Sequence, residues 1–489
     1  MAPVTTDTSE PALSLLMDRL SWPVKMVRWR TAKAIRTLLE QEPTREKATR
    51  ALLDWMAARD LESEVCSVLS LLTVVNEEAK PDLRDVAPCV KRPSILSDIL
   101  LEVAYGWSLG GWDEGLRPDA PEYFEPSQYF EQHKTAHVPP ILLNSLSKLE
   151  AKSGKPFKRQ WAYEWHVLRE ETGILFTQYP YYFGDFALAR SGIHGQFLQR
   201  QSELYRSAYL RVFAHAVAAW DMPVRSATAY CLEVLPAVPG LFEVEPQARP
   251  KWVSDFPAKL HDPSADFQKL GRALVKAGVS RSRVAVSLDV PLPKEIAEFG
   301  AVSATAFLCS ADFEPAEDFD PFLPETLVFS HDVGLGDDIR FRNFEDVRVD
   351  GKVGWCAPVS THLIPMPSGL WHDEYLGAGM AIPAAYCFDS TPRLSADDRG
   401  LALSIGKDLV ATTSFWHDDW TPLAPKKGAT RIGVVSCINR RLLKKTLQRF
   451  EARLGWFLRL SALEGERIYG DLKPRERLTF FLDTNEVGP

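Results

Sequence analysis

The sequence predicts an α+β protein, with α-helices in its N-terminal half and a mixed α/β or β-rich domain in its C-terminal half. Apolar residues recur at helical spacing through most of the first 235 residues. Beyond Pro236 prolines multiply, and short runs of β-branched and aromatic residues are separated by turn residues. Because long helices do not alternate regularly with these runs, we expect a mixed sheet rather than a doubly wound parallel one.

Residues 1–105 read as antiparallel helix pairs, an α-helical repeat region whose apolar faces need stacking neighbours. Pro23 suits the first turn of a helix because its φ is fixed and it lacks an N–H group. Apolar side chains follow it at helical spacing as far as residue 41. We therefore expect stacked helices over residues 11–105, with four side chains of this stretch buried between them: Val27, Ala34, Ile35 and Leu38.

Three regions follow the repeats. Residues 106–140 are rich in proline, glycine and aromatic residues, which predicts an ordered loop. Residues 141–259 are predicted to form a second helical domain, whose longest helix, residues 195–220, carries a broad apolar stripe. Residues 260–489 form the predicted mixed α/β domain. Within it, residues 439–460 have the period of a basic amphipathic helix.

Composition and charge limit which classes of partner and which cell compartment are expected for this chain. The formal net charge is -8 and the isoelectric point about 5.8, so attraction to phosphate backbones would need a local basic patch. The N-terminus lacks the features of a signal peptide, and no apolar run approaches the ~18 residues of a membrane helix. Seven cysteines without a CxxC pair indicate buried, reduced thiols. We expect a cytoplasmic protein without a membrane segment.

Nucleotide-binding motifs are absent from the sequence. Each Gly-Lys pair, at Gly154, Gly351 and Gly406, lacks both the following hydroxyl residue and the upstream glycine of a P-loop. No GxGxxG pattern follows a plausible strand either. The sequence therefore predicts neither an NTPase nor a dinucleotide enzyme, and no cofactor.

The sharpest catalytic pattern is GxSxG, formed by Gly106, Ser108 and Gly110, which is the spacing of a turn that presents a serine nucleophile. That turn needs a helix directly after the serine, whereas glycines and prolines follow here, and no oxyanion loop of the HGGG type occurs. The pattern therefore favours a glycine-rich loop. A hydrolase that uses Ser108 is kept as the alternative.

Histidine-aspartate pairs offer a second hydrolase site, because a histidine and carboxylates together can hold a metal ion that activates water. These pairs lie in loops and at strand ends, where adjacent side chains point to opposite faces. Turn carboxylates and surface histidines are therefore the favoured interpretation, and no metal site is predicted. The four pairs begin at His261, His331, His372 and His417.

The stretch SFWHDDWTPL, residues 414–423, is the densest of these clusters. Its aromatic and charged side chains could form a recognition pocket, because large rigid aromatics dominate binding hot spots. They could equally be two core tryptophans with a capping aspartate, and the sequence leaves both interpretations open. The candidate partner contacts in this stretch are Trp416, His417, Asp418, Asp419 and Trp420.

The helix predicted from Asn439 adds Arg441 and Lys445 as candidate contacts for an acidic partner or a nucleic acid. A solvated basic face above an apolar stripe is also the ordinary state of an amphipathic helix. The acidic isoelectric point weakens the nucleic-acid interpretation, so a protein partner is favoured.

Two resemblances bear on function. The pattern Trp22-Pro23, Val27-Arg28, Ala34-Ile35 and Leu38-Leu39 resembles a HEAT repeat. The segments WAYEWHVLREETGILFTQYPYYFGD, ELYRSAYLRVFAHAVAAW and ATAYCLEVLP are similar to regions C-terminal to the ATPase of bacterial NACHT/STAND defence proteins. In such proteins the repeat region senses a ligand, often a foreign protein, while a P-loop domain oligomerises. Because this chain lacks the P-loop, the resemblance implies only the sensing role.

The sequence thus predicts a non-enzymatic protein-interaction or sensor protein, and the resemblance implies a place in a bacterial antiviral defence system. A helical-repeat platform joined to a mixed α/β domain would bind a protein partner in the cytoplasm. The alternative is a hydrolase, and nucleic-acid binding through the basic helix is a third class.

Overall fold

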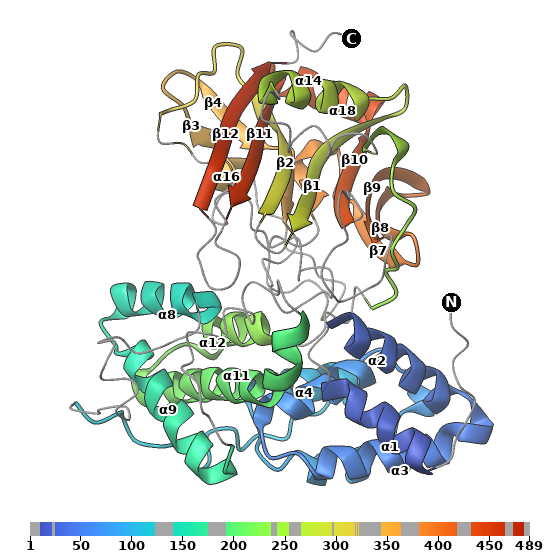
Figure 1. Ribbon diagram of the computed structural model, residues 1–489, viewed down its shortest axis with the longest axis vertical. Helices are drawn as coiled ribbons and strands as arrows, with labels where there is room; N and C mark the ends of the chain where they lie inside the picture. The colour runs from blue at the N-terminus through green and yellow to red at the C-terminus, as the bar shows by residue number, and fades with distance from the viewer. Residues whose placement is uncertain are drawn as a thin grey trace. The chain divides into compact units, whose positions relative to one another are not determined.

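The chain forms two compact units in the computed structural model (Figure 1). The first, which we call the helical unit, comprises Met1–Phe242 with Met366–Glu374, and the second, the sheet unit, comprises Glu243–Pro365 with Tyr375–Pro489. The structure describes residues 10–21, 25–122, 140–174, 192–235, 242–253, 266–295, 298–317, 319, 321, 344–362, 381–417, 432–464 and 473–483.

The helical unit confirms the predicted helical N-terminal half. Its helices are α1 (Glu10–Asp18), α2 (Lys25–Glu40), α3 (Glu42–Ala57), α4 (Glu62–Leu72), α5 (Leu83–Val86), α6 (Ile95–Tyr105), α8 (Pro140–Ser153), α9 (Phe157–Thr172), α11 (Gly192–Trp220) and α12 (Val224–Cys231), with the 3-10 turns η1 (Arg19–Ser21), η2 (Glu77–Ala79), η3 (Ala87–Cys89) and η5 (Leu232–Val234) between them.

Helix α6 shows how local sequence sets the ends of an element. Ser94 caps its N-terminus by accepting a hydrogen bond from the Ser97 N–H, and the Ser97 hydroxyl oxygen in turn accepts from the Ser94 N–H. The helix ends at Gly106, whose φ of +65° lies in the left-handed region that favours glycine. The first glycine of the GxSxG pattern is therefore a helix C-cap, and the chain continues as a loop.

Helix α11 is the centre of the helical unit. Its apolar stripe includes Tyr205, Tyr209 and Phe213, all fully buried. The Tyr205 ring stacks on Trp161 of α9 at a centroid distance of 5.6 Å, and the Ser207 hydroxyl donates a hydrogen bond to Ser63 Oγ of α4. Helices on both sides of the 106–140 loop thus share one core.

This packing changes the domain division expected from the sequence. Residues 1–105 and 141–235 belong to one unit rather than two, and the boundary to the next unit falls after Phe242 instead of residue 259. Of the side chains expected in the core, Ile35 and Leu38 are 0% and 5% exposed, whereas Val27 and Ala34 are only half-buried. Residues 123–139 of the predicted loop lie outside the described part of the chain.

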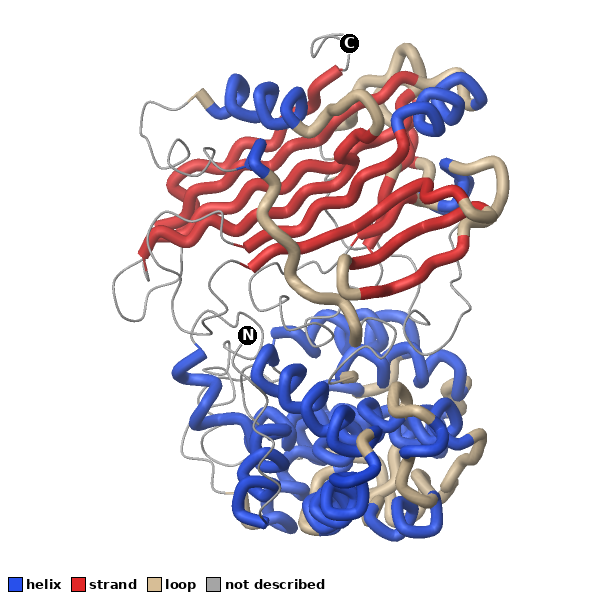
Figure 2. Tube along the Cα trace, turned by 90° about the vertical axis from the view of Figure 1, so that its right-hand side faces the viewer, coloured by secondary structure: helices blue, strands red, loops and turns tan. Residues whose placement is uncertain are grey.

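The sheet unit is built on an antiparallel sheet, in which the strand order is β12-β11-β2-β1-β10-β9-β8-β7; β4 also pairs with β2, and β3 pairs with β4 (Figure 2). Its elements are η7 (Lys251–Val253), α14 (Phe267–Ala277), β1 (Arg283–Glu295), β2 (Glu298–Cys309), α16 (Phe344–Val347), β3 (Val349–Asp350), β4 (Trp355–Pro358), β5 (Ser360–His362), β6 (Ala381–Pro383), η8 (Ala385–Cys387), β7 (Arg393–Asp397), β8 (Gly400–Ile405), β9 (Asp408–His417), β10 (Ile432–Asn439), α18 (Arg440–Arg449), β11 (Arg453–Glu464) and β12 (Lys473–Asp483).

Two smaller elements cover parts of this sheet. The β5–β6 pair lies against β9 and β10, where the hydroxyls of Thr413 and Ser436 both donate to the Ala381 carbonyl oxygen. Helix α14 packs on β11 and β12 (Figure 1). Among the described strands every pairing is antiparallel, so the β-rich form of the predicted C-terminal domain is the one that occurs.

The prediction that residues 439–460 form one helix is wrong beyond Phe450. Helix α18 ends at Arg449, and Glu451 adopts a positive φ of +48°, which a helix cannot continue through. Strand β11 follows and pairs with both β2 and β12. Trp456, Leu458 and Leu460 satisfy strand alternation as well as helical spacing, and the neighbouring strands decide between the two.

Among the described residues no helix is long and apolar enough to cross a bilayer.

We predict that Ile35→Asp destabilises the helical unit by at least about 3 kcal/mol, because an unpaired carboxylate would replace a fully buried side chain. Leu15→Asp is the matched control, since the Leu15 side chain is 66% exposed, and it should change stability by less than about 1 kcal/mol. Chemical denaturation of both variants measures the difference. Equal unfolding midpoints for the two variants would contradict the burial of Ile35.

Candidate functional site

The basic helix α18 is anchored to the sheet unit by one face. The side chain of Asn439 caps it by accepting hydrogen bonds from the N–H groups of Arg441 and Leu442. Leu443 and Thr446 are buried, and the Thr446 hydroxyl donates to the Cys387 carbonyl oxygen. At the other end Arg449 pairs with Asp389 at 2.7 Å. This anchoring fixes which side chains of α18 face solvent.

The opposite face of α18 carries exposed cations. Arg441, Lys444 and Lys445 are exposed, and Arg440 is half-buried with its guanidinium donating to the Ser280 carbonyl oxygen at 3.3 Å. Two arginines therefore lie in the first turn, which contains no acid. Cations near a helix N-terminus oppose the helix dipole and cost stability. The helix thus keeps an unfavourable charge arrangement that its own fold does not need.

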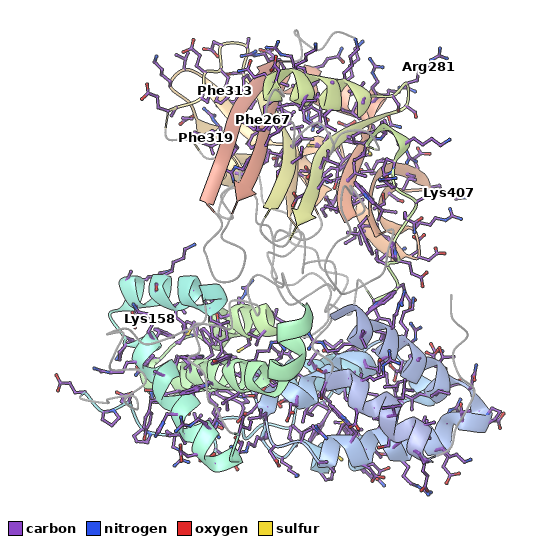
Figure 3. All side chains as sticks on the ribbon, viewed as in Figure 1. Lys158, Phe267, Arg281, Phe313, Phe319 and Lys407 are labelled. Carbon is purple, nitrogen blue, oxygen red and sulfur yellow. The ribbon has the colours of Figure 1, made fainter. Side chains whose placement is uncertain are left out.

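A second basic segment meets the start of α18. Arg281 lies in the turn that precedes β1 and Arg283 begins the strand, both are exposed, and the Arg440 N–H donates to the Ser282 carbonyl oxygen at 2.9 Å. Figure 3 shows Arg281 at the end of the sheet unit where α18 lies. We define the basic surface as the six cations of these two segments: Arg281, Arg283, Arg440, Arg441, Lys444 and Lys445. In the part of the chain that the structure describes, none of the six forms an ion pair.

The aromatic cluster at residues 416–420 is placed only in part. Trp416 is 1% exposed and lies over Gly433 on the neighbouring strand β10, so it belongs to the core and cannot contact a partner. The core interpretation of this tryptophan is therefore the correct one. His417 ends β9, and Asp418, Asp419 and Trp420 lie outside the described residues.

Within the described part of the chain, Ser108 lies in a loop that a carboxylate anchors. Its hydroxyl donates to Asp98 Oδ2 at 2.9 Å, and the N–H groups of Leu109 and Gly110 donate to the same carboxylate. A loop rather than a helix follows the serine, so no helix N-terminus stabilises an oxyanion there. Asp98 instead fixes this loop to α6.

The remaining catalytic candidates are the histidine-aspartate pairs and the cysteines. No cluster of histidine, cysteine and acidic side chains there could hold a metal ion. The pairs at His261, His331 and His372 lie outside the described part of the chain. All seven cysteines are free, as the sequence predicts, and burial raises the pKa of the least buried, Cys437, to about 11. Such thiols are poor nucleophiles at neutral pH.

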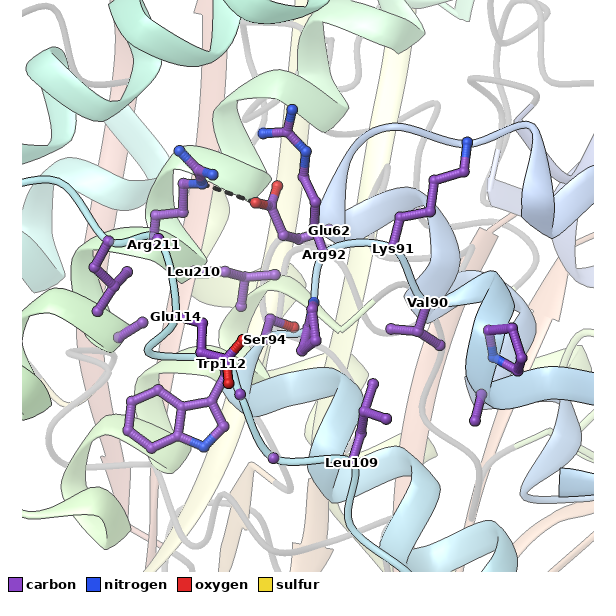
Figure 4. Close-up of a pocket in the computed structure, with 18 residues that line it drawn as sticks. Glu62, Val90, Lys91, Arg92, Ser94, Leu109, Trp112, Glu114, Leu210 and Arg211 are labelled. Carbon is purple, nitrogen blue, oxygen red and sulfur yellow. Dashed lines mark hydrogen bonds and ion pairs between the residues drawn. The ribbon is translucent and has the colours of Figure 1, made fainter. Parts of the chain in front are cut away.

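The helical unit contains a cavity of about 600 Å³ that sequence reasoning did not predict (Figure 4). Glu62 and Arg211 lie in its wall, and Arg211 Nε donates to Glu62 Oε1 at 2.8 Å. Behind them Arg211 also pairs with Glu164 at 3.5 Å, where burial raises the pKa of the Glu164 carboxyl. Only a weak signal in the sequence pointed to this cavity, namely the acidic residues at the start of an otherwise apolar helix, ESEVCSVLSLL.

A half-buried carboxyl in the sheet also escaped prediction. Asp289 on β1 accepts a hydrogen bond from the Ser303 hydroxyl on β2 at 3.0 Å, and the two residues are register partners. Burial raises the pKa of Asp289 to about 7. Alternation along β1 could have shown that Asp289 shares a face with Ser287, but not that this face is covered.

Comparison with models of known protein families finds no match to the chain, and comparison with curated proteins finds none either. The function proposed below therefore depends on the side chains themselves.

We expect that a fluorophosphonate probe will not label the protein and that Ser108→Ala will leave its melting temperature nearly unchanged. Asp98→Ala should cost about 2 kcal/mol, because the half-buried N–H groups of Leu109 and Gly110 lose their acceptor. Mass spectrometry and thermal denaturation measure the two effects. Stoichiometric labelling that disappears in Ser108→Ala would support the alternative that the protein is a hydrolase.

The raised pKa of Asp289 makes stability depend on pH with a defined sign. The folded state holds the proton more tightly than the unfolded chain, so the free energy of unfolding should fall as pH rises from 3.8 to about 7. A single group contributes a slope of at most about 1.4 kcal/mol per pH unit. Asp289→Asn should remove this contribution, whereas the exposed control Asp408→Asn should keep it. Parallel pH profiles for all three proteins would refute the assignment.

Proposed function

We propose that this chain is a non-enzymatic interaction or sensor protein of the bacterial cytoplasm whose sheet unit binds an acidic protein through the basic surface. The helical unit serves as a HEAT-like platform in this proposal. The sensing role follows from the resemblance to the sensor regions of NACHT/STAND defence proteins, and all seven cysteines being free fits a reducing compartment.

The observation that carries the proposal is that the six cations of the basic surface, none of which forms an ion pair among the described residues, gather on an acidic chain. Residues 267–288 and 440–450 each contain five cations and no acid, although the whole chain has a net charge of -8. The fold joins the two segments through the hydrogen bond between Arg440 and Ser282. The arginines in the first turn of α18 also oppose its dipole. A partner with negative charge would offset both the mutual repulsion and the dipole.

An acidic protein fits this surface better than a nucleic acid does. A long polyanion would meet the field of a chain with net charge -8 over most of its length. A short acidic segment of a protein needs to contact only the basic surface. Among the described residues, the exposed large hydrophobic side chains do not include an aromatic one beside the basic surface on which a base could stack. Arginine also favours bidentate pairing with carboxylates.

We predict that Arg441→Glu combined with Lys445→Glu weakens capture of the partner by at least about tenfold while the melting temperature does not fall, because both side chains are exposed and an acid in the first turn of α18 favours its dipole. Affinity purification from the native host, with nuclease present, identifies proteins that bind the parent chain. The captured proteins should be acidic, and their binding should weaken as salt is raised.

The matched control is Lys352→Glu combined with Lys407→Glu, which changes the net charge equally at exposed sites elsewhere in the sheet unit; Figure 3 shows Lys407 away from Arg281. This control should capture the same proteins as the parent. Capture that survives the reversal at Arg441 and Lys445, or that nuclease abolishes, would reject an acidic protein as the partner.

A further inference from the structure

Two of the free cysteines face each other across neighbouring strands of the sheet unit. Cys309 ends β2, Cys356 lies in β4, and the two are register partners in an antiparallel pair. Both side chains are 0% exposed, and both belong to one hydrophobic cluster with Phe307, Phe313 and Phe457. No residue of the basic surface belongs to this cluster. The proposed function therefore leaves the cysteine pair without a role.

The backbone hydrogen bonds around the cysteine pair show which kind of cross-strand pair it is. One position further along, the Ser310 N–H donates to the Trp355 carbonyl oxygen at 3.0 Å. Three positions in the other direction, the Val359 N–H donates to the Ala306 carbonyl oxygen at 2.8 Å. Because hydrogen-bonded and non-hydrogen-bonded pairs alternate along an antiparallel ladder, the two cysteines occupy a non-hydrogen-bonded position.

That position has the backbone spacing that a disulfide needs. The Cα atoms of a non-hydrogen-bonded pair lie about 4.5 Å apart, and its side chains are closer than those of a hydrogen-bonded pair. A disulfide spans Cα atoms about 4.4–6.8 Å apart. An S–S bond between Cys309 and Cys356 therefore fits between the strands without a change of register.

The turns at the ends of β2 and β4 hold this register. The Glu314 N–H donates to the Val353 carbonyl oxygen at 3.0 Å, and the Lys352 N–H donates to the Glu314 carbonyl oxygen at 2.9 Å. Gly354 has a φ of +66°, and a Cβ there would stand 2.1 Å from Ser310 Oγ. A slip of β4 by one residue would break these contacts, so the two cysteines stay opposite each other.

In the reduced protein neither thiol is placed to react. The Cys309 sulfur lies against Gly455 of β11, 2.8 Å from the position that a Cβ there would take, and rotation about χ1 is needed to turn it toward Cys356. Burial raises the pKa of the Cys309 thiol to about 12. Burial, with the Cys309 thiol nearby, also raises the pKa of Cys356. Because the thiolate is the reactive form, oxidation requires a local opening of the sheet.

Strand β4 lies where such an opening is expected. It is four residues long, and its outer neighbour β3 has only two residues. Strand β2, by contrast, pairs with β11 along its whole length. Short pairings near the border of a sheet open at a lower free energy than central ones. When β4 separates from β2, both thiols become accessible in the gap between the strands.

We propose that Cys309 and Cys356 form a disulfide when hydrogen peroxide reaches the open form of β4, and that the bond then fastens β4 to β2. The thiolate of one cysteine attacks a peroxide oxygen, so the O–O bond breaks and a sulfenic acid and hydroxide form. The hydroxide takes up the proton that the thiol released and becomes water. The second thiol displaces the sulfenic hydroxyl as another water, which forms the S–S bond. Two thiols thus lose two electrons, and these reduce the peroxide.

Peptide mapping of the full chain under non-reducing conditions tests the proposal, after treatment with hydrogen peroxide in urea concentrations below the unfolding transition. The peptide that contains Cys309 should be linked to the peptide that contains Cys356. The rate of linking should rise with urea, because opening of β4 limits it. The link should raise the melting temperature by at least about 3 °C, and dithiothreitol should reverse this rise.

Three variants serve as controls. Cys356→Ala should abolish both the link and the rise in melting temperature. Cys437→Ala removes the least buried thiol and should retain both. Cys387 is the competing partner, since it and Cys356 both lie near Tyr386, and Cys387→Ala should also retain both. The peptide map of the parent chain decides the question even if a variant does not fold.

Three results would overturn the proposal. The first is that no link between Cys309 and Cys356 forms at any urea concentration below the transition. The second is that Cys356 links to Cys387 in preference to Cys309. The third is that the link lowers the melting temperature, which would mean that the register of the two strands does not accommodate the bond.

Discussion

The helical unit depends on charges that helix α11 buries. Arg206 and Arg211 lie on this helix, and their main partners are Glu203 on the same helix, Glu62 on α4 and Glu164 on α9. Removing a charge from water costs several kcal/mol, so each arginine requires a carboxylate at a defined place. Arg28 of α2 approaches the same Glu203 carboxylate at 3.6 Å. Four helices therefore have one relative arrangement in which these charges are paired.

This requirement also explains why a cavity persists beside the ion pairs. Apolar side chains can repack to fill space, but Arg211 is held to Glu62 at 2.8 Å and to Glu164 at 3.5 Å. The loop on the other side is fixed independently by Asp98. Both walls are thus held by charged contacts of their own, which favours keeping the space between them.

The sequence predicted features that repeat locally, and it missed those that depend on distant partners. The period of residues 195–220 predicted α11 because one face is apolar throughout. The end of α18 was missed because Trp456 and Leu458 fit a helix or a strand, and only pairing with β2 and β12 selects the strand. The cavity joins residue 62 to residue 211, a separation that no local pattern reveals. The cations at residues 440–445 were visible, whereas their junction with Arg281 required the fold.

The order of strands in the sheet has a consequence for how the protein is made. Strands β1 and β2 form a hairpin at residues 283–309, but their outer neighbours are β10 and β11, at residues 432–464. A hairpin with two open edges can pair with other chains. During translation these edges stay uncovered until more than a hundred further residues have left the ribosome, which takes roughly 6–25 seconds at about 5–20 residues per second. Crowded polysomes, where neighbouring nascent chains expose the same hairpin, are therefore the stage at which this protein is most vulnerable to aggregation.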